Sequence, residues 1–147
     1  FNLLSEENSM SLNNLAKRTA PQELTEFAAK QIQELLFNVQ GIELTMLCSS
    51  DGFELASFEK IKTNGKGKLA AVSSSIVAMV QAFMQELQLE GCQSITLDAN
   101  NSKAILTAIP HPKFPMLILA MTTNDVLLGQ LLYCTKKIAQ DISNFQI

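Results

Sequence analysis

Arginine is nearly absent from this sequence, and its basic residues do not outweigh its acidic ones. Arg18 is the single arginine among eleven basic residues, and fourteen acidic residues give a formal net charge of −3 and a pI of about 5.1. Nucleic-acid-binding domains usually carry a basic face, and bidentate phosphate recognition usually relies on arginine. The composition therefore argues against a general nucleic-acid binder and against an arginine-based phosphate site.

Long apolar runs are missing as well. The most apolar stretch, "MLILAM" at 116–121, is followed at once by the polar "TTND", whereas a bilayer-spanning helix needs about 20 apolar residues. The first residues, "FNLLSEENS", lack the basic segment of a signal peptide. We therefore expect no membrane span. A hydrophobic fraction of 47% in 147 residues is ample for the core of one domain.

Cysteine and histidine are too sparse for a metal site. Cys48, Cys92 and Cys134 lie far apart in apolar surroundings, and His111 is the only histidine. Zinc sites use Cys or His in short-spaced pairs, and the acidic residues lack the alternating spacing of a calcium loop. We expect no metal and no cofactor. An odd number of scattered cysteines predicts buried, reduced thiols and a cytoplasmic protein.

One stretch, "LCSSDGFELAS", resembles a catalytic sequence at first sight. A serine nucleophile needs a histidine held by a third group, yet His111 lies between two prolines and nothing in the sequence brings it to Ser50. The stretch is also not the G-x-S-x-G elbow. Asp51-Gly52 is the dipeptide that tight primed hairpin turns prefer. We therefore predict a hairpin turn here and a protein that is not an enzyme.

The connector "KIKTNGKGKLA" is lysine-rich and contains two Gly-Lys pairs. A phosphate-binding P-loop needs a glycine five residues earlier and Ser or Thr after the lysine, and neither condition is met. The lysines precede a predicted helix, so they form a local positive spot that suits an acidic partner or a phosphate. A solvated loop is the simpler interpretation. The lysines are Lys60, Lys62, Lys66 and Lys68.

Hydrophobic periodicity predicts one domain at 21–147 after a flexible arm at 1–20. A helix from Pro21 to about Gly41 is followed by two strands, "IELTMLC" and "FELAS", across the turn. A long helix at about 69–89 comes next, then the strands "SITLD", "SKAILTAI" and "PMLILAMT". A last helix begins at Asn124-Asp125, one of which is expected to cap it. The order α-β-β-α-β-β-β-α predicts an α/β (α+β) fold with a five-stranded, mainly antiparallel sheet between helices.

The long helix is apolar over most of its girth. One apolar stripe contains Leu69, Val72, Ile76, Val80, Phe83 and Leu87, and it is widened by Val77, Met79 and Met84. Three consecutive serines from Ser73 give the first half of the helix small side chains. A helix of this kind must be buried on two sides. In so small a domain the second side is most simply covered by another copy of the chain, so we expect self-association. A charge at Val77 is expected to disrupt it.

In their order and spacing these elements resemble the Roadblock family, the dynein light-chain Roadblock domain and its bacterial relatives. The resemblance extends over about 24–142 and includes the Asp51-Gly52 turn, the small residues Leu55-Ala56-Ser57 and the Leu128-Gly129 pair. It implies a Roadblock-like (profilin-like) fold and a homodimer whose long helices pack together and whose middle strand lies at the seam. The dimer-interface residues expected from the helix and from this resemblance are Ser73, Val77, Met84, Ile95, Thr96 and Leu97.

The resemblance also implies a function. Roadblock proteins are not enzymes; they bind Ras-like small GTPases as regulators or scaffolds, and some bacterial members raise GTP hydrolysis by orienting the partner's own residues. That mode suits a chain whose only arginine, Arg18, lies in the predicted arm. We therefore expect a homodimeric GTPase regulator. The alternatives are a signalling or cytoskeletal scaffold without a GTPase, a small-molecule sensor and, last, an enzyme.

Overall fold

The predicted fold class and element order are confirmed by a computed structural model, which describes residues 20–60, 62, 66–91 and 93–147. A five-stranded antiparallel sheet has the strand order β2-β1-β5-β4-β3. The predicted arm lies outside the described residues, except for Ala20, which packs in the core. The elements are α2 (Gln22–Asn38), β1 (Ile42–Ser49), β2 (Glu54–Glu59), the short 3-10 helix η1 (Lys66–Lys68), α3 (Leu69–Glu86), β3 (Ser94–Asp98), β4 (Ser102–Ile109), β5 (Met116–Thr123) and α4 (Leu128–Ser143).

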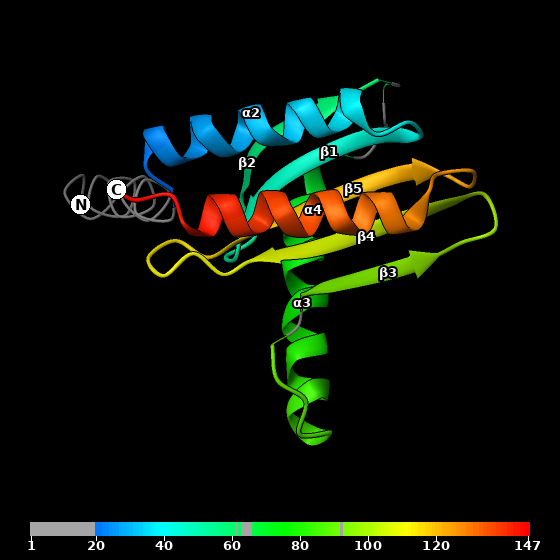
Figure 1. The fold of residues 1–147 in the computed structure, drawn as a ribbon. Coiled ribbons are helices and arrows are strands. Elements are labelled where there is room, and N and C mark those ends of the chain that lie inside the picture. Colours follow the sequence, from blue (N-terminus) through cyan, green and yellow to red (C-terminus); the bar gives the residue numbers. More distant parts are fainter. Residues whose placement is uncertain (1–19, 61, 63–65, 92) are drawn as a thin grey trace, which may run out of the picture.

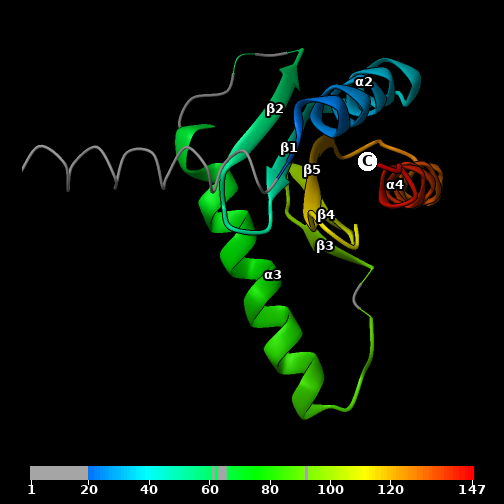
Figure 2. The ribbon, with the colours of Figure 1, turned by 90° about the vertical axis from the view of Figure 1, so that its left-hand side faces the viewer.

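Helices cover both faces of the sheet. Figures 1 and 2 show α2 and α4 side by side on one face and α3 on the other. The first face is filled by fully buried apolar side chains such as Leu24, Ile118 and Ile142. On the second face, Leu44, Met46 and their neighbours pack under the first half of α3. The central strands β1 and β5 are thus buried on both sides, which explains their nearly continuous apolar sequences.

The "SSDG" stretch is a hairpin turn, as predicted, but of a different class. The Ser49 and Gly52 amides donate to the Phe53 and Ser49 carbonyls, at 2.9 and 3.1 Å. Only Gly52 has a positive φ in this turn, +96°, whereas a two-residue primed turn of the Asp-Gly kind needs positive φ at both central residues. The geometry fits a three-residue loop with a left-handed glycine at its end. Ser74 of α3 also donates to the Ser50 carbonyl, so the turn is tied to the helix.

Gly52→Ala is expected to lower the free energy of unfolding by more than about 1 kcal/mol. Gly52 has a φ of +96°, and an added Cβ would lie 3.2 Å from the Ala71 Cα, a backbone atom that cannot rotate away. The matched control is Gly129→Ala in α4, where a Cβ meets nothing within 4 Å and alanine favours the helix. Urea denaturation of both variants tests this; equal stability of the two would contradict the role assigned to Gly52.

Two predicted helix boundaries are wrong. Neither Asn124 nor Asp125 caps α4, which begins at Leu128 after the extended Leu127. Their side chains instead hold the turn after β5: Asn124 donates to the Asn100 carbonyl and Asp125 accepts from Thr123. Short polar side chains satisfy turn backbone as readily as helix ends, so composition alone does not separate the two uses.

The long helix also ends earlier than predicted. It stops at Glu86 because Gln88 adopts a left-handed φ of 60°. The Leu89 amide then donates back to the Met84 carbonyl at 2.9 Å, a common way of satisfying a helix C-terminus. Gly91 lies beyond this point, so a non-glycine residue performs the role that the sequence assigns to the glycine.

Helix α3 stands out from the rest of the molecule. Its second half extends past the β3 edge of the sheet (Figures 1 and 2), and only 11% of its residues are buried. By length and composition alone it could cross a membrane, since its 18 residues have a mean hydropathy of 1.2. The short apolar runs of the sequence predict no such segment, and α3 differs because its mean hydropathy is high without a long unbroken apolar run. A single helix of this kind is weak evidence for a membrane span, but so much exposed apolar surface needs a covering partner.

Candidate interface on α3 and β3

One side of α3 carries a row of exposed apolar side chains. Val72, Met79, Phe83 and Leu87 are exposed by 52%, 65%, 64% and 53%. Their spacings of seven, four and four residues place them on one helix face. The adjoining side packs on the sheet through the buried Ala70 and Ser73 and the half-buried Ile76 and Val77. We call the exposed row Val72, Met79, Phe83 and Leu87 the α3 stripe.

Strand β3 ends the sheet next to this helix. It pairs with β4 from Ser94 opposite Thr107 to Asp98 opposite Lys103, and within the described part of the chain no strand lies on its other side. Ile95 packs towards α3, whereas Leu97 is 47% exposed. An uncovered edge with an exposed leucine is a template for another strand. The α3 stripe and the β3 edge are therefore two adjoining surfaces that a second protein chain could cover.

The predicted interface residues fall into two groups. Thr96 and Leu97 are exposed on β3, where a second chain could reach them. Ser73 is buried against the sheet, and Val77, Met84 and Ile95 are half-buried within the single chain. Because Val77 already packs in the core under α3, a charge there would disturb the fold as well as any dimer. Val77 is therefore an unsuitable probe of the interface.

The sequence predicts that the helix is covered on two sides, without saying which residues meet the sheet. Its apolar stripe contains Val72, Phe83 and Leu87 and is widened by Met79, and the structure exposes all four. The signal was present in the spacing of Val72, Met79, Phe83 and Leu87, but an overlapping apolar series shares the same helix. Periodicity shows that two faces are apolar; it does not show which face meets the sheet.

The lysines of the basic connector are spread along the entry to α3. Lys60 and Lys68 are exposed, and the Lys60 ammonium lies 5.8 Å from the centre of the exposed Phe37 ring of α2. Lys62 is exposed too. Lys66 begins η1, but its side chain lies outside the described part, as do residues 61 and 63–65. The first turn of α3 contains no acidic residue, so that turn adds no negative charge next to Lys68.

The groups that suggested catalysis are engaged in holding loops together. The Ser49 hydroxyl accepts from the Phe53 amide at 3.1 Å. His111 accepts through Nδ1 from the Lys113 and Phe114 amides, at 3.1 and 3.2 Å, and its Nε2 lies 2.9 Å from the Phe145 carbonyl. The buried imidazole thus binds only backbone groups. Among the described residues no three His, Cys, Asp or Glu side chains come together as metal ligands.

Cys48 is a buried thiol, as expected, and Cys134 is half-buried; Cys92 lies outside the described residues. Burial, and secondarily the nearby Glu54 carboxylate, raise the pKa of Cys48 from 9.0 to about 12. A thiol is reactive only as the thiolate, so Cys48 is inert at neutral pH. Its position on β1 serves the core beneath α3.

The raised pKa of Cys48 predicts an alkaline loss of stability. The folded state holds this proton more tightly than the unfolded state, so the stabilising effect is complete below pH 9.0 and declines as the pH rises towards 12. Between these values the free energy of unfolding should fall by up to about 1.4 kcal/mol per pH unit. Urea denaturation from pH 8 to pH 11 should show this extra slope in the wild type and not in Cys48→Ala; parallel slopes would rule it out.

Comparisons with known proteins support the family and the fold predicted from the sequence. The family model described as the Roadblock/LC7 domain matches residues 28–112. The MglB gliding protein of Thermus thermophilus has a TM-score of 0.72 at 18% identity, covering 82% of this chain and 88% of its own. Myxococcus xanthus MglB also has a TM-score of 0.72, at 12% identity and coverages of 81% and 86%. A Roadblock/LC7 domain from Streptomyces avermitilis has a TM-score of 0.68 at 10% identity, with coverages of 78% and 92%.

A search of curated protein sequences found no match. At these low identities the structural likenesses establish the fold, while the family model, which spans more than half of the chain, establishes the family. The matched region includes the Asp51-Gly52 hairpin and the whole of α3. It ends in the loop between β4 and β5. The chain belongs to the Roadblock/LC7 domain family.

Proposed function

We propose that this protein is a cytoplasmic, non-catalytic homodimer that binds and regulates a Ras-like small GTPase. The single observation that carries the proposal is the α3 stripe, a row of exposed apolar side chains on a Roadblock domain. Self-association would cover this row with a second copy of the chain. The proposed role, binding a small GTPase, is inferred from the family.

The dimer is supported by the way the exposed apolar surface is arranged. Met79 and Phe83 are exposed and belong to the second half of α3, and that half extends past the sheet (Figure 2). Strand β3 is the last strand of the sheet at this end, and among the described strands it pairs only with β4. A second copy related by a two-fold axis presents the same helix and the same edge, so both surfaces are covered at once. Among structures with this fold, one MglB structure is described as having a tetrameric arrangement.

A protein partner suits α3 better than lipid does. The stripe occupies one side of the helix, while Gln81 and Gln85 are exposed on another side. A helix in the centre of a bilayer would have to bury these polar groups, which costs free energy without a partner. In a helix pair the same groups remain in water. The membrane-like length and hydropathy of α3 are therefore accounted for by self-association.

The GTPase partner is inferred from membership of the Roadblock/LC7 family and not from a binding pocket in the structure. Roadblock domains bind Ras-like GTPases, and the lysines near the start of α3, Lys60, Lys62 and Lys68, offer a positive surface for an acidic partner. The only arginine, Arg18, precedes the described domain. The domain itself therefore supplies no arginine finger, and any acceleration of hydrolysis would come from orienting the partner's own catalytic residues.

The test is an affinity capture from lysate of the source organism, run with GDP and with a non-hydrolysable GTP analogue. We expect a small GTPase to be enriched in one nucleotide state, and the purified GTPase to bind directly with the same preference. GTP hydrolysis by that GTPase is then measured with and without this protein, and this protein alone should show no turnover. Capture indifferent to nucleotide, with no direct GTPase binding, would instead favour a scaffold.

A further inference from the structure

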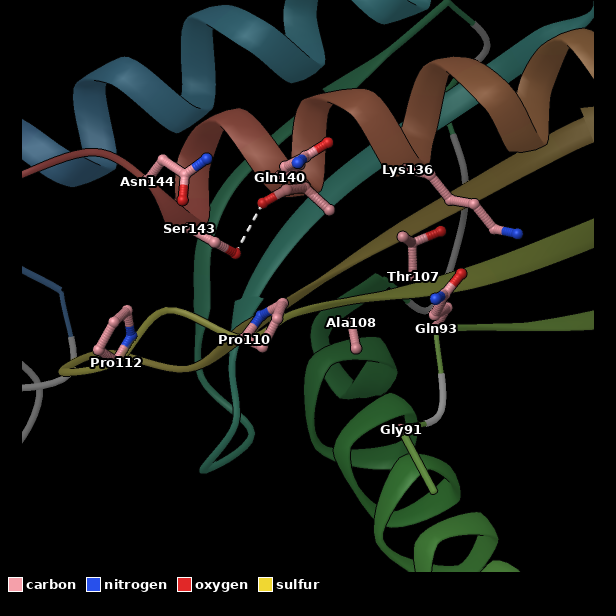
Figure 3. Close-up of a pocket in the computed structure, with 11 residues that line it drawn as sticks. Gly91, Gln93, Thr107, Ala108, Pro110, Pro112, Lys136, Gln140, Ser143 and Asn144 are labelled. Atoms are coloured by element: carbon pink, nitrogen blue, oxygen red, sulfur yellow. Dashed lines mark hydrogen bonds between the residues drawn. The ribbon is translucent and has the colours of Figure 1, made fainter. Parts of the chain in front are cut away.

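A cavity opens on the sheet face opposite α3, between the second half of α4 and strand β4. Its volume is about 680 Å³. Figure 3 shows it bounded by Lys136 and Gln140 of α4 above, by Thr107 of β4, and by the proline loop that follows β4. Cavities of about 300–1,000 Å³ are the usual size for small-molecule sites. No residue of the α3 stripe and none of Lys60, Lys62 and Lys68 lines it, whereas its residue Gln93 directly precedes β3.

The cavity arises because α4 does not cover the whole sheet. Helix α4 packs over β4 and β5, where Ile105 and Ile109 of β4 are fully buried beneath it and beneath α2. Thr107 alternates with these two residues and so faces the same side. The neighbouring strand β3 lies beyond the helix (Figure 2). A shelf is therefore left beside α4, and Thr107 lies at its inner end.

Thr107 is the unusual residue of this shelf. It is 1% exposed, and its hydroxyl has no hydrogen-bond partner in the described structure. Buried hydroxyls nearly always have a partner, because leaving one unsatisfied costs free energy that the isosteric valine would avoid. The residue is thus a poor choice for packing alone. Thr107 lines the adjoining cavity, so a ligand bound there would give this hydroxyl a partner.

The other lining groups define which ligand fits. Lys136 is the only charged residue in the lining, so the cavity carries one positive charge and no carboxylate. Gln93 and Gln140 add amides, which donate and accept. Pro110 and Pro112 supply a rigid apolar wall. This arrangement suits a small molecule with one anionic group and an apolar body.

We propose that this cavity binds a small organic acid. Its carboxylate or phosphate group lies between the Lys136 ammonium and the Thr107 hydroxyl, and its apolar part rests against Pro110 and Pro112. Carboxylate and phosphate both present anionic oxygen acceptors. The structure therefore assigns an anionic head group, and the experiment distinguishes a carboxylate from a phosphate. The site lies on the sheet face that α3 does not cover.

The first test uses four named probes followed by amide chemical shifts and by calorimetry. Benzoate and phenyl phosphate carry an anionic group and an apolar ring, benzyl alcohol lacks the charge, and inorganic phosphate lacks the ring. We expect at least one of the first two to shift the amides of Thr107, Lys136 and Gln140 with a dissociation constant of about 1 mM or tighter. The preferred one identifies the head group. Benzyl alcohol and inorganic phosphate should each bind at least about tenfold more weakly.

Two adjacent lysines provide a matched pair of variants. Lys136 lines this cavity, whereas Lys137 lines a groove between α2 and α4 on another side of the helix. Lys136→Gln should weaken binding about tenfold or more, and Lys137→Gln, which removes the same charge, should leave it unchanged. Thr107→Val should weaken binding about threefold to tenfold and melt no lower than the wild type, because valine fills the same space without an unpaired hydroxyl.

The proposal is overturned by any of three results. Neither anionic probe shifts these amides at tens of millimolar; or Lys136→Gln and Lys137→Gln weaken binding equally, which would indicate general charge attraction; or Thr107→Val melts well below the wild type, which would mean that the hydroxyl is satisfied within the fold. None of these readouts depends on the oligomeric state or on a GTPase, so failure here leaves the proposed function standing, and the reverse holds too.

Discussion

The double variant Met79→Glu/Phe83→Glu is expected to be a folded monomer. Both side chains are about two-thirds exposed in a single chain, so the charges cost the isolated domain little. In a helix-to-helix interface they would be buried without partners and would face the same charges across the two-fold axis, at a cost of several kcal/mol. We expect dimer dissociation to shift by more than about a hundredfold. Light scattering coupled to size exclusion measures the mass directly.

The matched control uses the other side of the same helix. Gln81→Glu/Gln85→Glu introduces the same two charges at exposed positions that lie away from the stripe, so this variant should remain dimeric. Circular dichroism should show unchanged helix content in both variants. A dimer that survives the stripe variant, or a control that dissociates equally, would remove α3 from the interface. A wild type that is monomeric at high concentration would remove the homodimer itself.

Ile118→Ala is expected to cause the largest loss of stability in the domain. Ile118 is fully buried on β5, which lies between β1 and β4, and it packs towards α2 and α4 with Leu24 and Ile142. Truncation at such a site costs about 2–5 kcal/mol, since the lost contacts leave a cavity that a rigid sheet cannot close. That is a large part of the total stability of a typical domain, about 5–15 kcal/mol.

A graded series makes this prediction specific. Ile118→Val removes one methyl group and should cost about 0.5–1.5 kcal/mol, while Leu127→Ala, at an exposed position before α4, should change stability by less than about 0.5 kcal/mol. Urea denaturation at one fixed protein concentration compares them, because self-association adds a concentration-dependent contribution. A loss for Ile118→Ala no greater than that for Leu127→Ala would mean that β5 is not the centre of the core.

The sequence predicted the architecture well because its elements carry strong local signals. The changes of period before and after the 42–59 hairpin, together with Asp51-Gly52, predicted two strands and a turn, and the apolar faces predicted α2 and α4. The turn class was wrong because Asp-Gly occurs both in primed turns and in loops where only the glycine has positive φ. Helix caps failed for a similar reason, since Asn124 and Asp125 bind turn groups.

The candidate sites were less accessible to sequence reasoning. The apolar content of α3 implied two covered faces, but choosing the face that meets the sheet required its angle to the strands, which is a tertiary property. Thr107 gave no signal at all, because threonine is an ordinary strand residue and only its burial without a partner makes it unusual. The cavity beside it is formed by α4, β4 and the segment after α3, which come together only in the fold.

The stacked rings of Phe27 and Phe145, with centroids 4.7 Å apart, have a practical meaning for engineering. They hold the start of α2 and the segment after α4 at the same end of the molecule (Figure 1). In a variant that begins at α2, a linker can therefore join the start of α2 to the segment after α4, and new ends can be opened in the exposed Asn100-Asn101 turn between β3 and β4. Two copies of the domain can also be joined in one chain by a linker from the segment after α4 of the first copy to the start of α2 of the second. Such a single-chain pair would allow the two halves of a dimer to be varied independently, so that one intact α3 stripe is set against one altered stripe.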